Sequence, residues 1–371
     1  MIKPSIAFIC GNGDTLYRFR LEIIKRFLEK GYSVYALAPE IPDDFLAELQ
    51  SLGVIFKKIN FKRKTVNIFD TFFSIVHLTK ELKKLNPNIV FSYTHKAVVV
   101  GSICAFLAGR LRSFSLITGT GHIFDNSTII ERAKRFLGIL GFKLALRLNE
   151  KIFFQNPDDL TLFCNLKMVS ENKTFLVNGS GVDLDKFSVK PIPEQPVFLC
   201  MSRLIKSKGL IEYAEASRIV KKNFPSARFL LHGFPDDHND SINEDEIISM
   251  WKKKYGVEYL GFSNDPVRDI SKCSVYVLLS YNEGTPRSVL EAMSLGRPII
   301  TTDVPGCRET VKNGKNGYLV PHKNSYEAAQ AMMRLMDPVL RQSMARSSRK
   351  YCEEKFDVHI VNRKILSEME I

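Results

Sequence analysis

The sequence has no run of apolar residues long enough to span a bilayer. Its longest largely apolar run, residues 97–108, contains 12 residues and is followed by Arg110, whereas a membrane-spanning helix needs about 20 apolar residues. Residues 1–4 lead directly into a strand-like segment at 5–10 and lack the pattern of a signal peptide. We therefore expect a cytoplasmic protein without a membrane-spanning helix.

Paired cysteines are also missing. The seven cysteines are scattered and none forms a C-x-x-C pair, so the sequence predicts neither a disulfide framework nor a zinc site. Asp183-Leu184-Asp185 has the form of a D-x-D metal motif. It lies in a join between two regions of regular structure, and we expect no metal there.

Acidic residues are scarce in the first half of the chain. Residues 1–190 contain 27 Lys and Arg against 17 Asp and Glu, whereas residues 191–371 contain 26 against 23. A basic first half suggests an anionic partner, such as nucleic acid, an anionic membrane or a diphosphate. The clustered aromatic and basic residues of nucleic-acid-binding motifs are missing, so we expect no nucleic acid among the partners.

The order of strand and helix signals predicts an α/β protein with two domains. Strand-like runs alternate with helical periodicity from residue 5 to about 180, and the alternation restarts at 197 after a glycine- and proline-rich join. We predict Rossmann-like domains at 1–188 and 189–352, followed by an amphipathic helix within 353–371. An acidic run at 236–246 is expected to be a mobile loop.

The most informative stretch is 274–303, which predicts a strand, a loop, a helix and a second strand. We expect Thr285 to cap a helix that begins at Pro286. The first amides of that helix, including those of Ser288 and Val289, then point outward as a site for a phosphate. Glu283 and Glu291 flank this site. Spacing alone leaves two interpretations open, a nucleotide-sugar site or a capped surface helix with solvated glutamates.

Further candidate residues follow other strands of the second half. Arg203 and Lys208 lie in a strand-to-helix loop, where two cations suit a diphosphate, although a basic surface turn is the commoner explanation. Gly233 and Gly261-Phe262 end two more strands, where a glycine allows a ligand to approach the backbone. Simple turn chemistry explains these glycines equally well.

The first half offers candidates at its predicted strand ends. Gly13 belongs to a weak G-x-G sequence that either admits a diphosphate or makes a turn. His95 and Lys96 follow the strand at 88–91, and His122 ends a glycine-rich loop after the strand at 114–117. A lone histidine is more often structural than functional. Arg20 shares a helix face with apolar neighbours, so we expect it to point partly inward.

Basic residues interrupt apolar segments of the first half. The segment 129–150 reads as an apolar helix with Arg and Lys along it, and an aromatic-rich segment at 68–75 lies between two lysine groups. Long cationic side chains over an apolar body suit an anionic membrane surface. A solvated face over a buried helix remains the alternative for any single segment.

The residues around Glu283 resemble a known family. Glu283-Gly284-x-Pro286-x-Ser288-Val289-x-Glu291-Ala292 is similar to the E-x7-E signature of the retaining glycosyltransferases of family four, and Pro305-Gly306-Cys307-x-Glu309 continues the likeness. The resemblance extends over nearly the whole chain. It implies the GT-B fold, with two Rossmann-like domains facing across a cleft and a C-terminal helix that crosses back to the first domain.

The resemblance also implies roles for the candidate residues. Arg203 and Lys208 match the family's R-L-x-x-x-K-G loop, so they, with Gly13, Ser288 and Val289, would bind the donor diphosphate. Glu291, Gly233, Gly261 and Phe262 would bind the nucleoside, and His95, Lys96 and Arg20 the acceptor. Glu283 and His122 would be catalytic, although the loop before His122 departs from the family pattern. GT-B enzymes generally need no metal, so we expect no cofactor.

The implied activity is a retaining transfer of N-acetylgalactosamine or another N-acetylhexosamine. The donor would be a UDP-sugar and the acceptor a polyprenyl-diphosphate-linked saccharide, used in glycan assembly at the inner face of the cell membrane, where the protein would be peripheral. One alternative is a UDP-sugar epimerase or hydrolase of the same fold. Another is a non-catalytic basic protein that binds membranes or nucleic acid.

Overall fold

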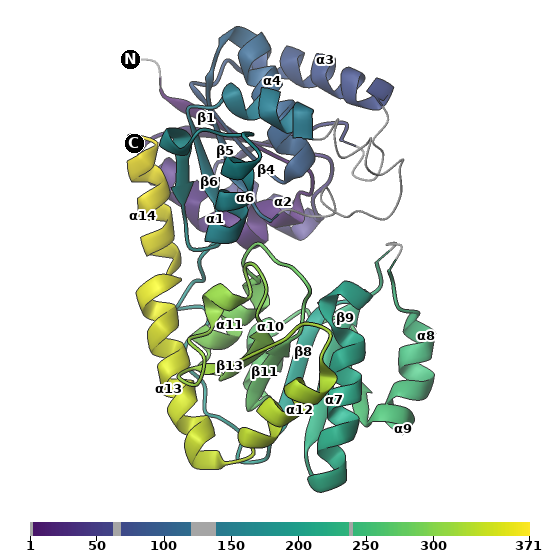
Figure 1. Cartoon of the computed structure of the whole chain (residues 1–371). Coiled ribbons are helices and arrows are strands. Elements are labelled where there is room, and N and C mark those ends of the chain that lie inside the picture. The colour runs from purple at the N-terminus through teal and green to yellow at the C-terminus, as the bar shows by residue number, and fades with distance from the viewer. Residues whose placement is uncertain (1–2, 62–67, 120–138, 237–239) are drawn as a thin grey trace. The chain divides into compact units, whose positions relative to one another are not determined.

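The structure, a computed structural model, describes residues 3–61, 68–119, 139–236 and 240–371. The chain forms two compact units (Figure 1). The first unit comprises residues 1–180 together with 361–371, and the second comprises 181–360. Each unit is described by itself below.

The first unit is built on a seven-stranded sheet in which every strand pair is parallel. The strand order is β3-β2-β1-β4-β5-β6-β7. This order reverses next to β1, as in Rossmann folds, where ligands bind at the carboxyl ends of the strands. The elements are β1 (Ser5–Cys10), α1 (Asp14–Glu29), β2 (Ser33–Ala38), α2 (Asp43–Ser51), β3 (Ile55–Lys58), α3 (Ile68–Leu85), β4 (Ile89–Tyr93), α4 (His95–Gly109), β5 (Arg112–Ile117), β6 (Lys151–Phe154), α6 (Pro157–Asn165) and β7 (Thr174–Leu176).

Alternate residues of the first unit's central strands pack on opposite faces. Ile6 and Phe8 of β1 pack with α1, whereas Ala7 and Ile9 pack with α3 and α4. Helix α14 (Val358–Glu368) packs on the α1 side of this core, where Val361, Ile365 and Leu366 of the helix and Met369 directly after it are buried. Residues from the far end of the sequence therefore complete the core of the first unit.

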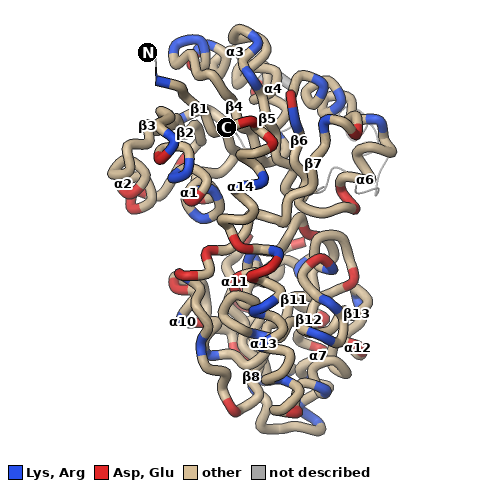
Figure 2. Tube along the Cα trace, turned by 90° about the vertical axis from the view of Figure 1, so that its left-hand side faces the viewer, with Lys and Arg blue, Asp and Glu red and all other residues tan. Residues whose placement is uncertain are grey.

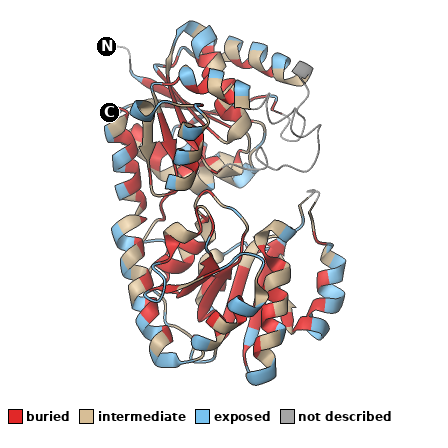
Figure 3. Cartoon of the chain, viewed as in Figure 1, coloured by how far each residue is buried: buried red, intermediate tan, exposed pale blue. Residues whose placement is uncertain are grey.

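The second unit is built on a six-stranded parallel sheet of order β10-β9-β8-β11-β12-β13. Helices α7 and α12 pack on one face and α10, α11 and α13 on the other, so buried residues line both sides of the strands (Figure 3). The elements are β8 (Val197–Arg203), α7 (Leu210–Asn223), β9 (Arg228–Phe234), α8 (Glu244–Glu246), α9 (Lys252–Tyr255), β10 (Val257–Tyr259), α10 (Pro266–Ser271), β11 (Val275–Leu278), α11 (Arg287–Ser294), β12 (Ile299–Thr302), β13 (Gly317–Val320), α12 (Ser325–Arg334) and α13 (Pro338–Lys355).

Three arginines attach the proline-rich join to the second unit. Arg297 is fully buried and donates to the carbonyl oxygens of Lys190 (2.7 Å) and Pro191 (2.9 Å). Arg341 donates to Glu194 O at 2.7 Å and Arg349 to Phe187 O at 3.2 Å. The join is therefore part of the second unit, and the chain divides after residue 180 rather than after 188.

The expected cap of α11 is wrong. The capping position is Pro286 and the helix begins at Arg287. Thr285 Oγ1 donates to the Gly284 carbonyl at 2.9 Å. Pro286 supplies a fixed φ at the turn, and a side-chain cap is not used.

Candidate functional site

The candidate residues of the second unit lie at the carboxyl ends of neighbouring strands. Arg203 ends β8, Gly233 lies in β9, and Glu283 follows β11. Because β9, β8 and β11 are adjacent and parallel, their ends meet at one edge of the sheet. Helix α11, the most amphipathic segment near this edge, begins four residues after Glu283.

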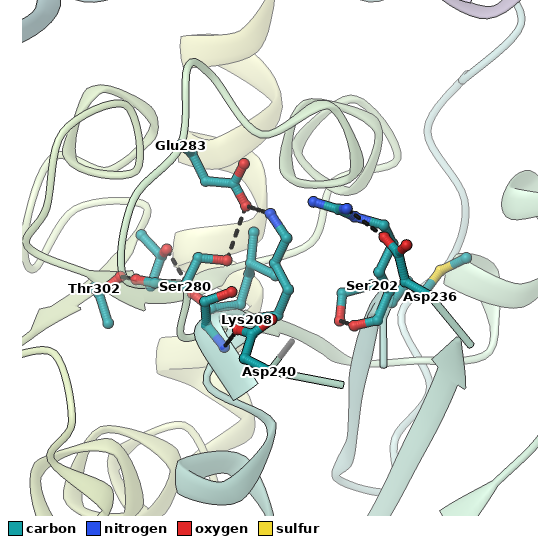
Figure 4. Close-up of polar contacts among 12 residues, drawn as sticks. Ser202, Lys208, Asp236, Asp240, Ser280, Glu283 and Thr302 are labelled. Carbon is teal, nitrogen blue, oxygen red and sulfur yellow. Dashed lines mark hydrogen bonds and ion pairs between the residues drawn. The ribbon is translucent and has the colours of Figure 1, made fainter. Parts of the chain in front are cut away.

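Lys208 and Glu283 form a direct ion pair. The Lys208 ammonium donates to Glu283 Oε1, and the Ser280 hydroxyl donates to the same oxygen at 2.9 Å (Figure 4). Both paired side chains are mostly buried, with relative exposures of 16% and 17%. Thr302 Oγ1 donates to the Ser280 carbonyl and fixes that residue in turn. One carboxylate oxygen of Glu283 is therefore held by two donors, while its position is set by neighbouring strand ends.

Two acidic residues that the sequence analysis did not single out contact the Arg203–Lys208 loop. Arg203 Nη1 lies 2.5 Å from Asp236 Oδ2, and Asp240 Oδ2 accepts from the Ser207 amide at 2.9 Å (Figure 4). Both lie in the acidic run that was expected to be a mobile loop. The buried Ile242 within that run was the available signal, because one apolar residue among acidic ones marks an attachment to the core.

The start of α11 offers fewer amides than expected. Val289 N donates to Pro286 O at 3.1 Å, so its amide is already bonded. Within the part of the chain that the structure describes, the amides of Arg287 and Ser288 have no hydrogen-bond partner. The Glu291 carboxylate is paired with an arginine, since Arg287 Nε lies 3.0 Å from Glu291 Oε1. Arg287 also donates to the Gly181 carbonyl.

The loop after β12 presses against the backbone that carries Glu283. Glu283 N donates to Pro305 O at 3.2 Å, and a Cβ on Gly306 would lie 2.3 Å from the carbonyl oxygens of both Glu283 and Gly284. Only glycine permits this approach, and its φ of +75° also favours glycine. Burial raises the pKa of the neighbouring Cys307 thiol to about 12, so this thiol stays neutral.

The nucleoside candidates lie on β9 and the turn after β10. Gly233 N donates to Gly261 O at 3.0 Å, which brings the two glycines together. Phe262 meets Phe234 edge to face with ring centroids 5.5 Å apart, and the rings are 50% and 41% exposed respectively. His232 is buried beside them, with Nδ1 at 3.1 Å from Gly261 O. Two exposed rings at a strand end can stack on a flat ligand.

The candidates of the first unit are mostly engaged in local contacts. Gly13 N donates to Glu40 O at 3.0 Å, and a Cβ there would lie 1.9 Å from that oxygen, so Gly13 serves a close backbone approach. Arg20 is buried, as expected, with its guanidinium carbon 4.9 Å from the Tyr93 ring centroid. His122 lies outside the described residues.

His95 and Lys96 open helix α4. His95 Nε2 donates to Gly119 O at 2.7 Å, and Lys96 Nζ lies 5.6 Å from the centroid of the Phe61 ring. Thr94, which precedes them, has a φ of +71°, a strained value for a β-branched residue. Its Oγ1 accepts from Gly11 N at 3.2 Å. The turn into α4 is therefore held in a costly conformation, as is common at functional sites.

Helix α3 exposes an apolar and basic stripe, which we call the α3 stripe. Phe72 and Phe73 are 60% and 66% exposed and Val76 is exposed one turn later. The same face continues with three exposed lysines, Lys80, Lys83 and Lys84. Figure 2 shows Lys and Arg in blue along α3. Among the helices that the structure describes, none combines the length and the apolar character needed to cross a bilayer.

No group of three or more potential metal ligands is found among the described residues. The Asp183 carboxylate of the D-x-D sequence accepts from the amides of Asp185 and Lys186, each at 3.0 Å. It therefore shapes a turn.

Comparisons with known proteins show similarity to glycosyltransferases. Residues 182–351 match the family model of the glycosyl transferases group 1. The chain is 29% identical over 358 residues to the N,N'-diacetylbacillosaminyl-diphospho-undecaprenol alpha-1,3-N-acetylgalactosaminyltransferase of Campylobacter jejuni, covering 92% of each chain. It is 26% identical over 309 residues to the UDP-Gal:alpha-D-GlcNAc-diphosphoundecaprenol alpha-1,3-galactosyltransferase of Escherichia coli, covering 80% of this chain and 78% of that one.

Solved structures share the fold at low identity. Anabaena HepE in complex with UDP superposes with a TM-score of 0.78 at 18% identity over 99% of both chains. Sucrose-phosphate synthase from Thermosynechococcus elongatus gives 0.79 at 17% identity, covering 99% of this chain and 98% of that one. The expected GT-B fold is thus confirmed. The chain has this fold, and its residues 182–351 resemble the glycosyl transferases group 1.

Proposed function

We propose that the protein transfers an N-acetylhexosamine, most specifically N-acetylgalactosamine, from a UDP-sugar to a polyprenyl-diphosphate-linked saccharide with retention at the anomeric carbon. The observation that supports a sugar-transfer site most directly is the mostly buried Lys208–Glu283 pair beside the start of α11. The Campylobacter and Escherichia relatives, both named for undecaprenol-diphosphate-linked acceptors, support the acceptor class, and the name of the Campylobacter relative supports N-acetylgalactosamine as the sugar.

In this proposal the donor diphosphate binds between cations and helix amides. Arg203 and Lys208 supply two positive charges, and the amides of Arg287 and Ser288 supply donors at a helix start, where the helix dipole favours an anion. The Val289 amide is already bonded, so in this proposal Val289 acts only by holding the first turn of α11 in shape. Stabilising the charge that develops on the leaving UDP is an electrostatic task that such fixed donors perform well.

The bond between the anomeric carbon and the donor phosphate oxygen breaks, and the acceptor hydroxyl attacks the same face of the sugar. The hydroxyl proton passes to a donor phosphate oxygen, and UDP leaves. Glu283, held by Lys208 and Ser280, binds hydroxyls of the donor sugar or stabilises the cationic carbon. Glu291 holds the ribose, which requires its carboxylate to keep an oxygen for the ligand while Arg287 binds the other.

The remaining candidates complete the proposal. Gly233, Gly261 and the exposed Phe262 bind the uridine. In the first unit, the acceptor is bound by His95, Lys96 and Arg20, and His122 helps to organise the reaction. The Gly13 amide is already bonded to Glu40 O, so Gly13 supports the diphosphate site only by shaping the loop. No metal takes part.

We further propose that the first unit binds an anionic membrane surface, where a polyprenyl acceptor resides. The α3 stripe supports this because exposed phenylalanines can enter the interface while the lysines contact anionic headgroups. The exposed Phe106 and Leu107 of α4 add apolar surface on a helix that shares its core cluster with α3. The protein is then peripheral at the inner face of the cell membrane.

The test is product analysis with purified protein, a panel of UDP-sugars and short-chain polyprenyl-diphosphate saccharides. We expect one UDP-N-acetylhexosamine to give a lipid-linked product with an α linkage by NMR, and Glu283→Ala and Lys208→Ala to lower turnover by about a hundredfold or more. Lys206→Ala, an exposed lysine of the same loop, is the matched control and keeps its activity.

Other outcomes would identify the alternatives. Release of UDP without a lipid-linked product indicates a hydrolase, and interconversion of UDP-sugars indicates an epimerase. If UDP causes no thermal shift, the protein is a non-catalytic membrane-binding or nucleic-acid-binding protein.

A further inference from the structure

The acidic residues after β9 are built into the loop that carries Arg203 and Lys208. Leu204 O accepts from Ile242 N at 2.8 Å, and Ile205 pairs with Ser241 in an antiparallel bridge. Ile242 is buried in the core of the second unit. The described residues 240–242 therefore lie against the 204–206 backbone through a single β-bridge, and Ile242 attaches them to the core.

Asp240 binds the turn that leads to Lys208 through two separate groups. Its carbonyl accepts from Lys206 N at 2.8 Å and its carboxylate Oδ2 accepts from Ser207 N at 2.9 Å. Residues 206–208 form a single 3₁₀ turn, which has few hydrogen bonds of its own. A turn this short depends on outside acceptors for its shape, and Asp240 supplies two of them.

Asp236 performs a related task for Arg203. Its Oδ2 lies 2.5 Å from Arg203 Nη1, and the Asp236 side chain is 18% exposed against 33% for Arg203. A guanidinium has five N–H donors, and this contact uses one edge of it. Arg203 can therefore be oriented by Asp236 and still present its other edge to an anion.

We propose that Asp236 and Asp240 are positioning residues for the donor diphosphate, Asp236 through Arg203 and Asp240 through the turn that carries Lys208. This inference rests on the proposed function, because it takes the two cations to bind the diphosphate. Neither aspartate touches the ligand. Each fixes a cation before the ligand arrives, so that less side-chain and backbone freedom is lost on binding.

The first experiment tests the geometry without any ligand. Hydrogen exchange of the peptide 204–209 is compared in the full chain and in Asp240→Ala, Asp240→Asn and Asp245→Ala. Asparagine keeps an oxygen that can accept from Ser207 N, whereas alanine does not. Asp245 is an exposed aspartate of the same run, so it controls for the loss of charge. We expect faster exchange in Asp240→Ala alone.

The second experiment measures binding of UDP and of uridine by calorimetry. We expect Asp240→Ala and Asp236→Ala to weaken UDP binding about tenfold and to leave uridine binding unchanged, because both aspartates act on the groups that bind phosphate. Asp240→Asn should restore most of the UDP affinity, and Asp245→Ala should behave as the unmodified protein.

The results separate the two proposals. If the unmodified protein binds no UDP, the proposed function is wrong and so is the positioning role. If it binds UDP and Asp240→Ala binds equally well, or if UDP and uridine weaken together, the function stands and the positioning role is wrong. Tighter binding of UDP to Asp236→Ala would show that this carboxylate competes with the diphosphate, which also overturns its positioning role.

Discussion

Gly306→Ala tests how closely the loop after β12 controls the position of Glu283. The new methyl carbon would lie 2.3 Å from the carbonyl oxygens of Glu283 and Gly284, whereas Cβ atoms in proteins essentially never approach closer than 3.0 Å. The two loops must therefore separate by about 0.7 Å or more. Such a movement also strains the hydrogen bond from Glu283 N to Pro305 O, which measures 3.2 Å.

The expected magnitude follows from that displacement. A shift of about 1 Å in a reacting or charge-stabilising group can cost about a hundredfold in rate. We expect turnover to fall between about thirtyfold and a hundredfold. Alanine with a positive φ also costs about 1 kcal/mol of folding stability, or about 2–4 °C in Tm for a unit of this size.

Gly314→Ala is the matched control. Gly314 has the same φ of +75°, but a Cβ there would meet no atom within 4 Å. Both variants therefore incur the same backbone strain, and only Gly306→Ala displaces Glu283. The assay is initial-rate transfer from the UDP-sugar to the lipid-linked acceptor, with Tm measured in parallel. Equal turnover in the two variants would refute the argument that Gly306 positions Glu283.

Three further predictions concern stability and the membrane. Arg297→Met should lower the free energy of unfolding by about 3 kcal/mol in urea titrations, because buried carbonyls lose their donor; a loss below about 1 kcal/mol would contradict it. Arg268, with Ser263 and Lys272, holds the pKa of Asp269 well below its ordinary value of 3.8. The free energy of unfolding lost in Asp269→Asn should therefore be constant near neutral pH and shrink as the pH falls below 3.8. A difference in stability between the two proteins that widens in acid would exclude this. Replacing Phe72 and Phe73 by serine should reduce sedimentation with anionic vesicles several-fold, whereas Val339→Ser, at a 77% exposed position of α13, should not.

The fold could be predicted from the sequence because its signals are local. Strand-like apolar runs alternate with amphipathic segments along nearly the whole chain, and parallel sheets bring the ends of successive strands to one edge. Arg203, Gly233 and Glu283 each follow or end such a strand, so their placement at one edge required no knowledge of distant contacts.

The contacts that were missed are long-range. Asp240 and Ser207 are 33 positions apart, and Arg297 binds the Lys190 carbonyl across 107 positions. In the sequence, both the polar run 236–246 and the proline-rich join have the composition of loose connections. Nothing local shows which distant donors bind their carbonyl oxygens. The capping of α11 failed for a different, local reason, since the helix begins one residue later than expected and Pro286 takes the capping position.

Helix α14 has a consequence for the order in which the protein can fold. Val361, Ile365 and Leu366 of this helix, with Met369 directly after it, pack on the α1 side of the first unit's core. A ribosome translates this helix only after it has made the whole second unit. During synthesis the first unit therefore lacks these four core residues until the last residues of the chain have been translated.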